Sequence, residues 1–82
     1  MIDVLYFAWV RERVGAARER ISTDAATVAA LIEDLKARDP RYATAFADTA
    51  ALRCAVDQEL VGFDAPITAA REVAFFPPMT GG

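Results

Sequence analysis

The sequence predicts one α+β domain in which a mixed sheet of about five strands packs against one main helix. One stretch, residues 27–38, has the periodicity of an amphipathic helix. Short segments that we expect to be strands lie on both sides of it, two before and three after. The chain has 82 residues, of which 55% are hydrophobic, enough for one small core. This order of elements fits a sheet that wraps its apolar face around the helix.

Two strands are expected at the start of the chain. Residues 2–7 are rich in β-branched and aromatic side chains, and a second strand is expected over residues 18–22, where three charged residues lead to Ile21. The charged residues 11–13 and Gly15 separate the two segments and predict a turn. We therefore expect the two strands to pair as a β-hairpin.

The main helix is expected to begin after Thr27, which is a good N-cap residue. Its apolar residues follow the i, i+3, i+4, i+7 spacing of one helical face: Val28, Leu31, Ile32 and Leu35. The helix should end near Arg38, because Pro40 disfavours helical geometry at Asp39. A shorter second helix is expected over residues 41–47.

Three more strands are expected in the second half. Residues 52–56 and 60–61 are separated by Asp57 and Gln58, which predict a turn. Gly62 and Pro66 mark a loop, and residues 73–76 form the last strand. Residues 1–76 therefore make up the domain, and residues 77–82 an extended tail.

Composition excludes several functions. Nine basic and twelve acidic residues give a net charge of −3, so nucleic acid is not an expected partner. The chain has no His and a single Cys, so we expect no metal site, no bound cofactor and no nucleophile paired with an imidazole base. No basic leader precedes residue 2 and no apolar run reaches about 18 residues, so no membrane association is expected and the cytoplasm is the expected compartment.

The end of the chain can carry chemistry on its backbone carboxylate. Pro77 and Pro78 fix φ and favour an extended path, and Gly81 and Gly82 leave the terminus free of side-chain bulk. Joining the Gly82 carboxylate to AMP would create a mixed anhydride that a sulfur nucleophile can attack. The product would be a thiocarboxylate.

The ending Phe-Phe-Pro-Pro-Met-Thr-Gly-Gly at residues 75–82 resembles the small subunits of molybdopterin synthase, the sulfur carriers of molybdenum cofactor biosynthesis. Residues 4–8, 10–12, 55–58 and 60–66 extend the resemblance over nearly the whole chain. Two departures affect turns: Asp57 stands where the family often has Asn, and Ala70-Arg71 replaces Gly-Asp, which would strain Ala70 if φ were positive there.

The resemblance implies a β-grasp, ubiquitin-like fold. It implies that an ATP-dependent adenylyltransferase of the ubiquitin-activating type activates Gly82 and that a sulfur-donating enzyme supplies the sulfur. The tail would then enter the large subunit, which supplies the catalytic side chains, and give sulfur to a cyclic pyranopterin precursor. Two small and two large subunits would form a heterotetramer.

The same resemblance assigns roles to individual residues. Gly82 would carry the sulfur, Gly81 would provide clearance, and the threading segment would consist of Pro77, Pro78, Met79 and Thr80. Three apolar residues on separate strands would help to dock partners: Phe7, Leu60 and Phe76. Ordinary core packing is an equal alternative for these side chains. Cys54 lies within a predicted strand, where a free Cys usually packs as a small hydrophobe.

The amino-acid sequence alone leaves three other functions open. A ubiquitin-like modifier would join the same terminus to lysines of other proteins. Carriers for thiamine or cysteine synthesis share the Gly-Gly ending. An interaction module with an inert tail would need no side-chain chemistry at all.

Overall fold

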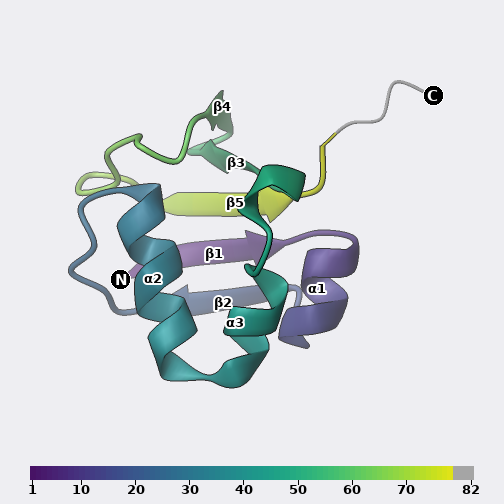
Figure 1. The fold of residues 1–82 in the computed structure, drawn as a ribbon. Coiled ribbons are helices and arrows are strands. Elements are labelled where there is room, and N and C mark those ends of the chain that lie inside the picture. Colours follow the sequence, from purple (N-terminus) through teal and green to yellow (C-terminus); the bar gives the residue numbers. More distant parts are fainter. Residues whose placement is uncertain (79–82) are drawn as a thin grey trace.

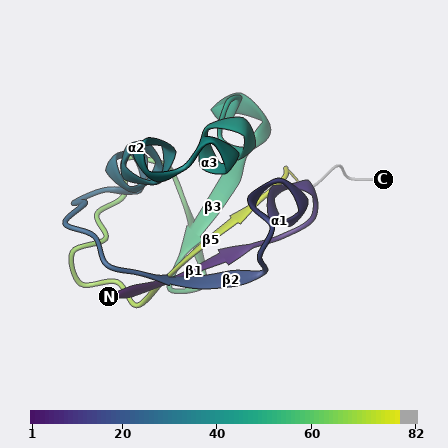
Figure 2. The ribbon, with the colours of Figure 1, turned by 90° about the horizontal axis from the view of Figure 1, so that it is seen from below.

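The computed structural model describes residues 1–78, which form an α+β fold with a five-stranded sheet in the order β2-β1-β5-β3-β4. The helices lie together on one face of this sheet (Figures 1 and 2). In chain order the elements are β1 (Ile2–Tyr6), α1 (Trp9–Val14), β2 (Arg18–Ile21), α2 (Val28–Arg38), α3 (Pro40–Ala45), the 3₁₀ turn η1 (Thr49–Ala51), β3 (Arg53–Val56), β4 (Glu59–Val61) and β5 (Glu72–Phe76). The expected mixed sheet on one main helix is confirmed.

The last strand lies in the centre of the sheet. β5 runs parallel to β1, with Val73 opposite Val4, and antiparallel to β3, with Phe75 opposite Cys54. β1 also pairs antiparallel with β2, so the expected pairing of the first two strands is confirmed. Both chain halves therefore meet at β5.

The sequence predicted a turn between β1 and β2. This prediction was wrong, because the chain forms helix α1 there. Val10 and Val14, four residues apart, are both buried under this helix. Their burial stabilises a helix of six residues, which is too short to be stable from intrinsic helix propensity alone. Gly15 ends the helix at φ 89°, and its N–H donates to the Arg11 carbonyl at 2.8 Å. That left-handed position suits glycine.

The main helix has the bounds that the sequence predicted. The Thr27 hydroxyl accepts a hydrogen bond from the Ala30 N–H at 3.1 Å, which satisfies one of the free donors at the N-terminus of α2. The helix buries four side chains against the sheet: Val28, Leu31, Ile32 and Leu35. Asp39 is extended and caps α3, which begins at Pro40 and ends two residues earlier than expected.

The turn between β3 and β4 depends on two residues with positive φ. Asp57 and Gln58 have φ values of 48° and 70°, as a two-residue hairpin of the type I′ kind requires. The Asp57 carboxylate also accepts hydrogen bonds from the backbone N–H groups of Arg71 and Glu72, at 2.9 and 3.0 Å. It thus ties this hairpin to the start of β5. Within the described residues Ala70 does not have a positive φ, so the strain considered there is absent.

One carboxylate joins the sheet to α3. Glu19 of β2 points toward the helices, and one of its oxygens accepts hydrogen bonds from the hydroxyls of Tyr6 and Tyr42, at 2.9 and 2.6 Å. Arg41 lies 3.4 Å from the other oxygen. Burial and the Glu19 carboxylate raise the pKa of both tyrosines above their ordinary value, because each disfavours a tyrosinate.

This cluster predicts how the protein responds to alkali. A raised pKa in the folded state contributes stability that is fully present below the ordinary tyrosine pKa of about 10 and is lost as pH rises above it. The chain has two tyrosines, and both belong to the cluster. We therefore expect tyrosinate absorbance to appear in one step together with the loss of circular dichroism.

A Tyr42→Phe variant is the control, since its single tyrosine should show the same coincidence with about half the signal. Gradual ionisation with a midpoint near pH 10 in a chain that stays folded would contradict this description of the cluster.

Candidate functional site

The tail leaves the domain from the central strand of the sheet. The last residue of β5, Phe76, still pairs with Arg53 of β3, and on the other side the Phe7 N–H donates to the Phe75 carbonyl at 3.1 Å. Pro77 and Pro78 follow directly and are half-buried. The remaining residues to which the sequence assigns a role lie outside the described residues: Met79, Thr80, Gly81 and Gly82.

The face of the sheet that the helices leave open carries a row of apolar residues. The strand register places Leu5 beside Ala74, Ala74 beside Ala55, and Ala55 beside Leu60. Because side chains alternate along a strand, these four residues share the face opposite the buried Val73 and Phe75. Figure 2 shows the helices on the other side of the sheet.

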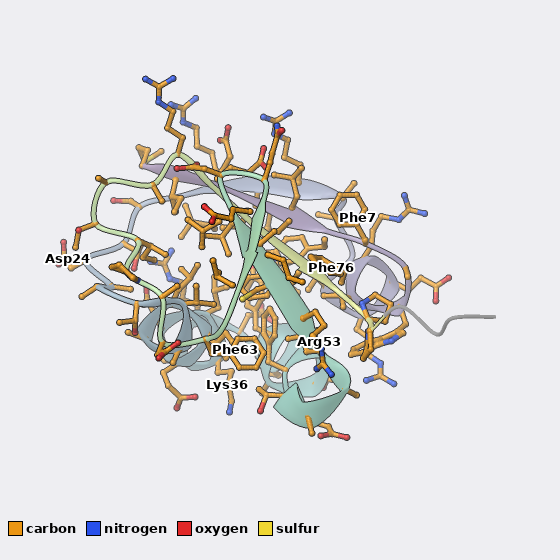
Figure 3. The ribbon with its side chains drawn as sticks, turned by 90° about the horizontal axis from the view of Figure 1, so that it is seen from above. Phe7, Asp24, Lys36, Arg53, Phe63 and Phe76 are labelled. Atoms are coloured by element: carbon orange, nitrogen blue, oxygen red, sulfur yellow. The ribbon has the colours of Figure 1, made fainter. Side chains whose placement is uncertain are left out.

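The predicted docking residues lie on this open face. Phe7 is 47% exposed and Leu60 is 68% exposed, whereas Phe75 is fully buried. Phe76 is half-buried, and in Figure 3 it lies near Phe7 on the side from which the tail leaves. Core packing therefore does not explain Phe7 and Leu60, and their role in docking stays a prediction.

The backbone at Ala8 determines how the chain passes from Phe7 into α1. Ala8 has φ 55° and ψ −132°, a conformation that side chains rarely adopt and that costs about 1–3 kcal/mol. The Val10 N–H closes this turn on the Phe7 carbonyl at 3.2 Å. Sequence reasoning missed Ala8, because alanine gives no signal for a positive φ.

Within residues 1–78, no group of three or more His, Cys, Asp or Glu side chains is arranged to hold a metal ion. Cys54 is buried in β3, its thiol donates to the Val61 carbonyl at 3.4 Å, and burial raises the pKa of that thiol. A buried thiol with a raised pKa is a poor nucleophile. None of the described helices is long and apolar enough to cross a membrane.

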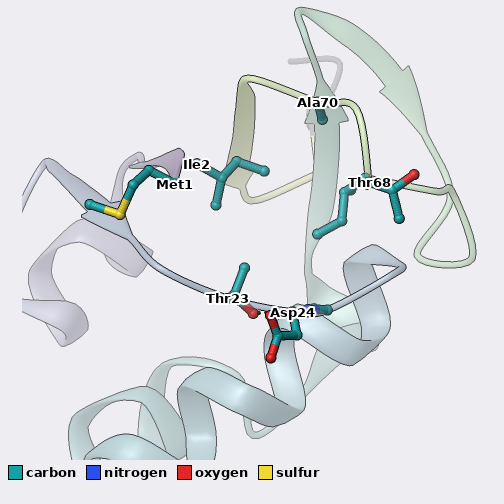
Figure 4. Close-up of a pocket in the computed structure, with 8 residues that line it drawn as sticks. Met1, Ile2, Thr23, Asp24, Thr68 and Ala70 are labelled. Carbon is teal, nitrogen blue, oxygen red and sulfur yellow. Dashed lines mark hydrogen bonds between the residues drawn. The ribbon is translucent and has the colours of Figure 1, made fainter.

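A hollow of about 220 Å³ lies near the N-terminus, at the other end of the domain from the tail. Met1, Thr23 and Asp24 are among the residues that line it (Figure 4). The Thr23 hydroxyl donates to Asp34 at 2.7 Å and accepts from the Ala25 N–H at 3.1 Å, so its hydrogen bonds are made within the protein. This hollow is not part of the tail exit.

Comparison with known proteins gives consistent results. The model of the ThiS family matches residues 4–82. The chain is 50% identical to the molybdopterin synthase sulfur carrier subunit of Escherichia coli (strain K12) over 82 residues, which cover the whole of both chains. It is 35% identical to the subunit of the same name from Haemophilus influenzae, again over the whole of both chains.

A solved structure agrees on the fold. Small archaeal modifier protein 1 (SAMP1) of Haloferax volcanii superposes with a TM-score of 0.77 over 99% of this chain and 98% of its own. At 23% identity this likeness concerns the ubiquitin-like β-grasp fold alone.

The two curated relatives and the family model confirm the resemblance that the sequence suggested. The chain therefore belongs to the ThiS family and, within it, to the molybdopterin synthase sulfur carrier subunits.

Proposed function

We propose that the chain carries sulfur on the carboxylate of Gly82 and delivers it, as the small subunit of a molybdopterin synthase, to a pyranopterin precursor. The observation that carries this proposal is the full-length identity of 50% to a sulfur carrier subunit in a chain that ends in Gly-Gly. The structure supports it, because the tail follows directly from the central strand of the sheet.

Activation and loading take two steps. The Gly82 carboxylate attacks the α-phosphorus of ATP, which releases pyrophosphate and leaves an acyl adenylate. Hydrosulfide from a sulfur-donating enzyme then attacks the acyl carbon, the C–O bond to AMP breaks, and a proton is lost. The product is a thiocarboxylate, and neither step needs a reductant. ATP is the substrate of the activating partner, and this chain itself needs no cofactor.

Delivery returns the chain to its starting state. The thiocarboxylate sulfur attacks a carbon of the precursor and forms a C–S bond, while the bond from that carbon to an oxygen leaving group breaks and the released oxygen takes up a proton. Water then cleaves the acyl–sulfur bond. This regenerates the Gly82 carboxylate. A dithiolene contains two sulfur atoms, so two loaded chains serve each product molecule, which suits an assembly of two small and two large subunits.

The described domain contributes docking and anchoring. The partners in this proposal are the large synthase subunit, an adenylyltransferase of the ubiquitin-activating type and the sulfur donor. Each must hold the domain while the tail reaches its active site, and the open face with Phe7, Leu60 and Phe76 adjoins the tail exit. We place these reactions in the cytoplasm, where the ATP that the activating partner uses is available.

Attachment to protein lysines is the weaker proposal. The likeness to an archaeal modifier protein is 23% identity, which concerns the fold, whereas both curated relatives are named sulfur carrier subunits. The same names favour the molybdenum pathway over thiamine or cysteine synthesis.

Removal of Gly82 tests the proposed chemistry. The carboxylate then sits on Gly81, one residue and about 3.5 Å short of its working position. Since misplacement by about 1 Å costs roughly a hundredfold in rate, molybdopterin formation with the purified large subunit should fall at least that far. The unfolding midpoint, measured on the same sample, should not change. A truncated chain that still supports synthesis would contradict the proposal.

Substitution of the exposed apolar residues tests docking. Phe7→Ala and Leu60→Ala should each weaken binding to the large subunit roughly 30-fold, the effect of losing an interface hot spot of about 2 kcal/mol. The free energy of unfolding should change little, since both side chains are exposed. Phe75→Ala is the matched control, because it empties the core and should cost about 3–5 kcal/mol of stability. If both variants bind the large subunit as tightly as the unsubstituted chain, the open face is not part of the docking surface.

A further inference from the structure

The arginines near the tail exit are not neutralised within the described part of the chain. Among residues 1–78, ion pairs join Arg18 to Asp3, Lys36 to Glu33, Arg38 to Asp34, and Arg41 to Glu19 and Asp39. The other arginines have no carboxylate partner among these residues: Arg11, Arg13, Arg20, Arg53 and Arg71. Three of them, Arg11, Arg13 and Arg53, belong to α1 or the start of β3, which adjoin the end of β5.

Two of these arginines are held in place by groups that leave their charge intact. The Arg13 guanidinium lies 4.5 Å from the centre of the Trp9 ring, a cation–π contact. Arg53 donates to the carbonyls of Ala50 and Leu52, at 3.3 and 2.8 Å. Aromatic rings and carbonyls restrict the motion of a guanidinium without cancelling its charge. Both groups are therefore positioned and still available for a carboxylate.

Arg13 and Arg53 lie on opposite sides of the strand that carries the tail. β5 pairs with β1, which leads through Phe7 and Ala8 into α1, and on its other side with β3, where Arg53 is opposite Phe76. Phe7 lies two residues before α1, which carries Arg13, and Phe76 pairs with Arg53, so each arginine lies on an element next to one of the two phenylalanines. Figure 3 shows Arg53 and the two phenylalanines at this end of the sheet.

The acidic groups nearby offset these charges only in part. Glu12 lies on α1 between Arg11 and Arg13 and makes no ion pair within residues 1–78. Asp48 caps η1, where its carboxylate accepts the Ala50 N–H at 3.1 Å. Three arginines therefore face two carboxylates at the tail exit, whereas the whole chain has a net charge of −3.

We propose that Arg13 and Arg53 dock carboxylates on the border of the adenylating enzyme's tail channel, on either side of the apolar contact made by Phe7 and Phe76. This inference rests on the proposed function. Charges at the rim of an interface act mainly on the rate of association and on its salt dependence. They suit a partner that the carrier must reach and leave once for each sulfur atom. A second copy of this chain is a poor occupant, because it would bring like charges together.

The test compares charge reversals at the two ends of the sheet. Adenylation is followed as pyrophosphate release by the purified adenylating enzyme, with the full chain as the varied substrate. The R13E/R53E double variant should lower kcat/KM roughly tenfold at low salt, at the lower end of the range for electrostatic steering. The difference should shrink above physiological ionic strength, where the Debye length falls below about 8 Å.

Arg20 provides the matched control. It is exposed, has no carboxylate partner within residues 1–78, and lies opposite Asp3, toward the end of the sheet away from the tail. R20E should leave kcat/KM within about twofold of the unsubstituted chain, since it is distant from the proposed contact. Arg13→Gln and Arg53→Gln, which remove charge without reversing it, should give intermediate values. Thermal unfolding shows whether each variant is folded.

The outcomes separate this inference from the proposed function. If the unsubstituted chain is adenylated and R13E/R53E behaves like R20E, the arginine contacts are wrong and the sulfur-carrier role stands. If the double variant slows binding to the large subunit and leaves adenylation unchanged, the assigned partner is wrong. If the unsubstituted chain is not adenylated at all, the proposed function itself fails.

Discussion

The two ladders that hold β5 are the constraint on which the rest of the structure depends. β1 pairs with one side of β5 as far as Phe75, and β3 pairs with the other side as far as Phe76, the last residue of the strand. The tail thus starts from a strand that is fixed on both sides. In the proposed function, this anchor fixes the start of the tail when a partner docks the domain.

The same central strand separates structural side chains from surface ones. Val73 and Phe75 point into the core, where the Phe75 ring lies 4.9 Å from the Phe46 ring and packs edge to face with it. Phe76 and Ala74 belong to the open face. Side chains alternate along the five residues of β5, so its inner face packs against the helices and its outer face belongs to the open side of the sheet, where Phe7 and Leu60 are exposed. Substitutions on the two faces should accordingly affect different properties.

The elements with a strong local signal were the ones that the sequence could predict. The apolar spacing from Val28 to Leu35 with the Thr27 cap defined α2, and the Asp57-Gln58 pair defined the β3–β4 turn. Helix α1 was missed because only Val10 and Val14 support it, and their burial depends on tertiary contacts. The family was recognisable because the ending Phe-Phe-Pro-Pro-Met-Thr-Gly-Gly is one continuous motif that can be identified without the fold, whereas the role of Gly82 stays a prediction.

Other features of the site depend on pairing between distant segments, which local sequence does not specify. Leu5 reaches Leu60 only through Ala74 and Ala55, across four strands. The sequence left open whether Phe7 is a core residue, since its exposure follows from its place beyond the end of β1. Neither the φ value of Ala8 nor the contact of Arg13 with Trp9 could be predicted from the types of those residues.

The most direct test of the central claim is the intact mass of the chain after incubation with ATP, the adenylating enzyme and a hydrosulfide source. A sulfur carrier that is loaded at its terminus should gain roughly 16 Da, the difference between sulfur and oxygen, in its C-terminal peptide, and this gain should be lost when ATP is omitted. An unchanged mass, with the adenylating enzyme active on another carrier, would contradict the central claim. A gain of roughly 32 Da, one whole sulfur atom, that maps to the peptide containing Cys54 would contradict it equally, because the sulfur would then reside on a thiol as a persulfide.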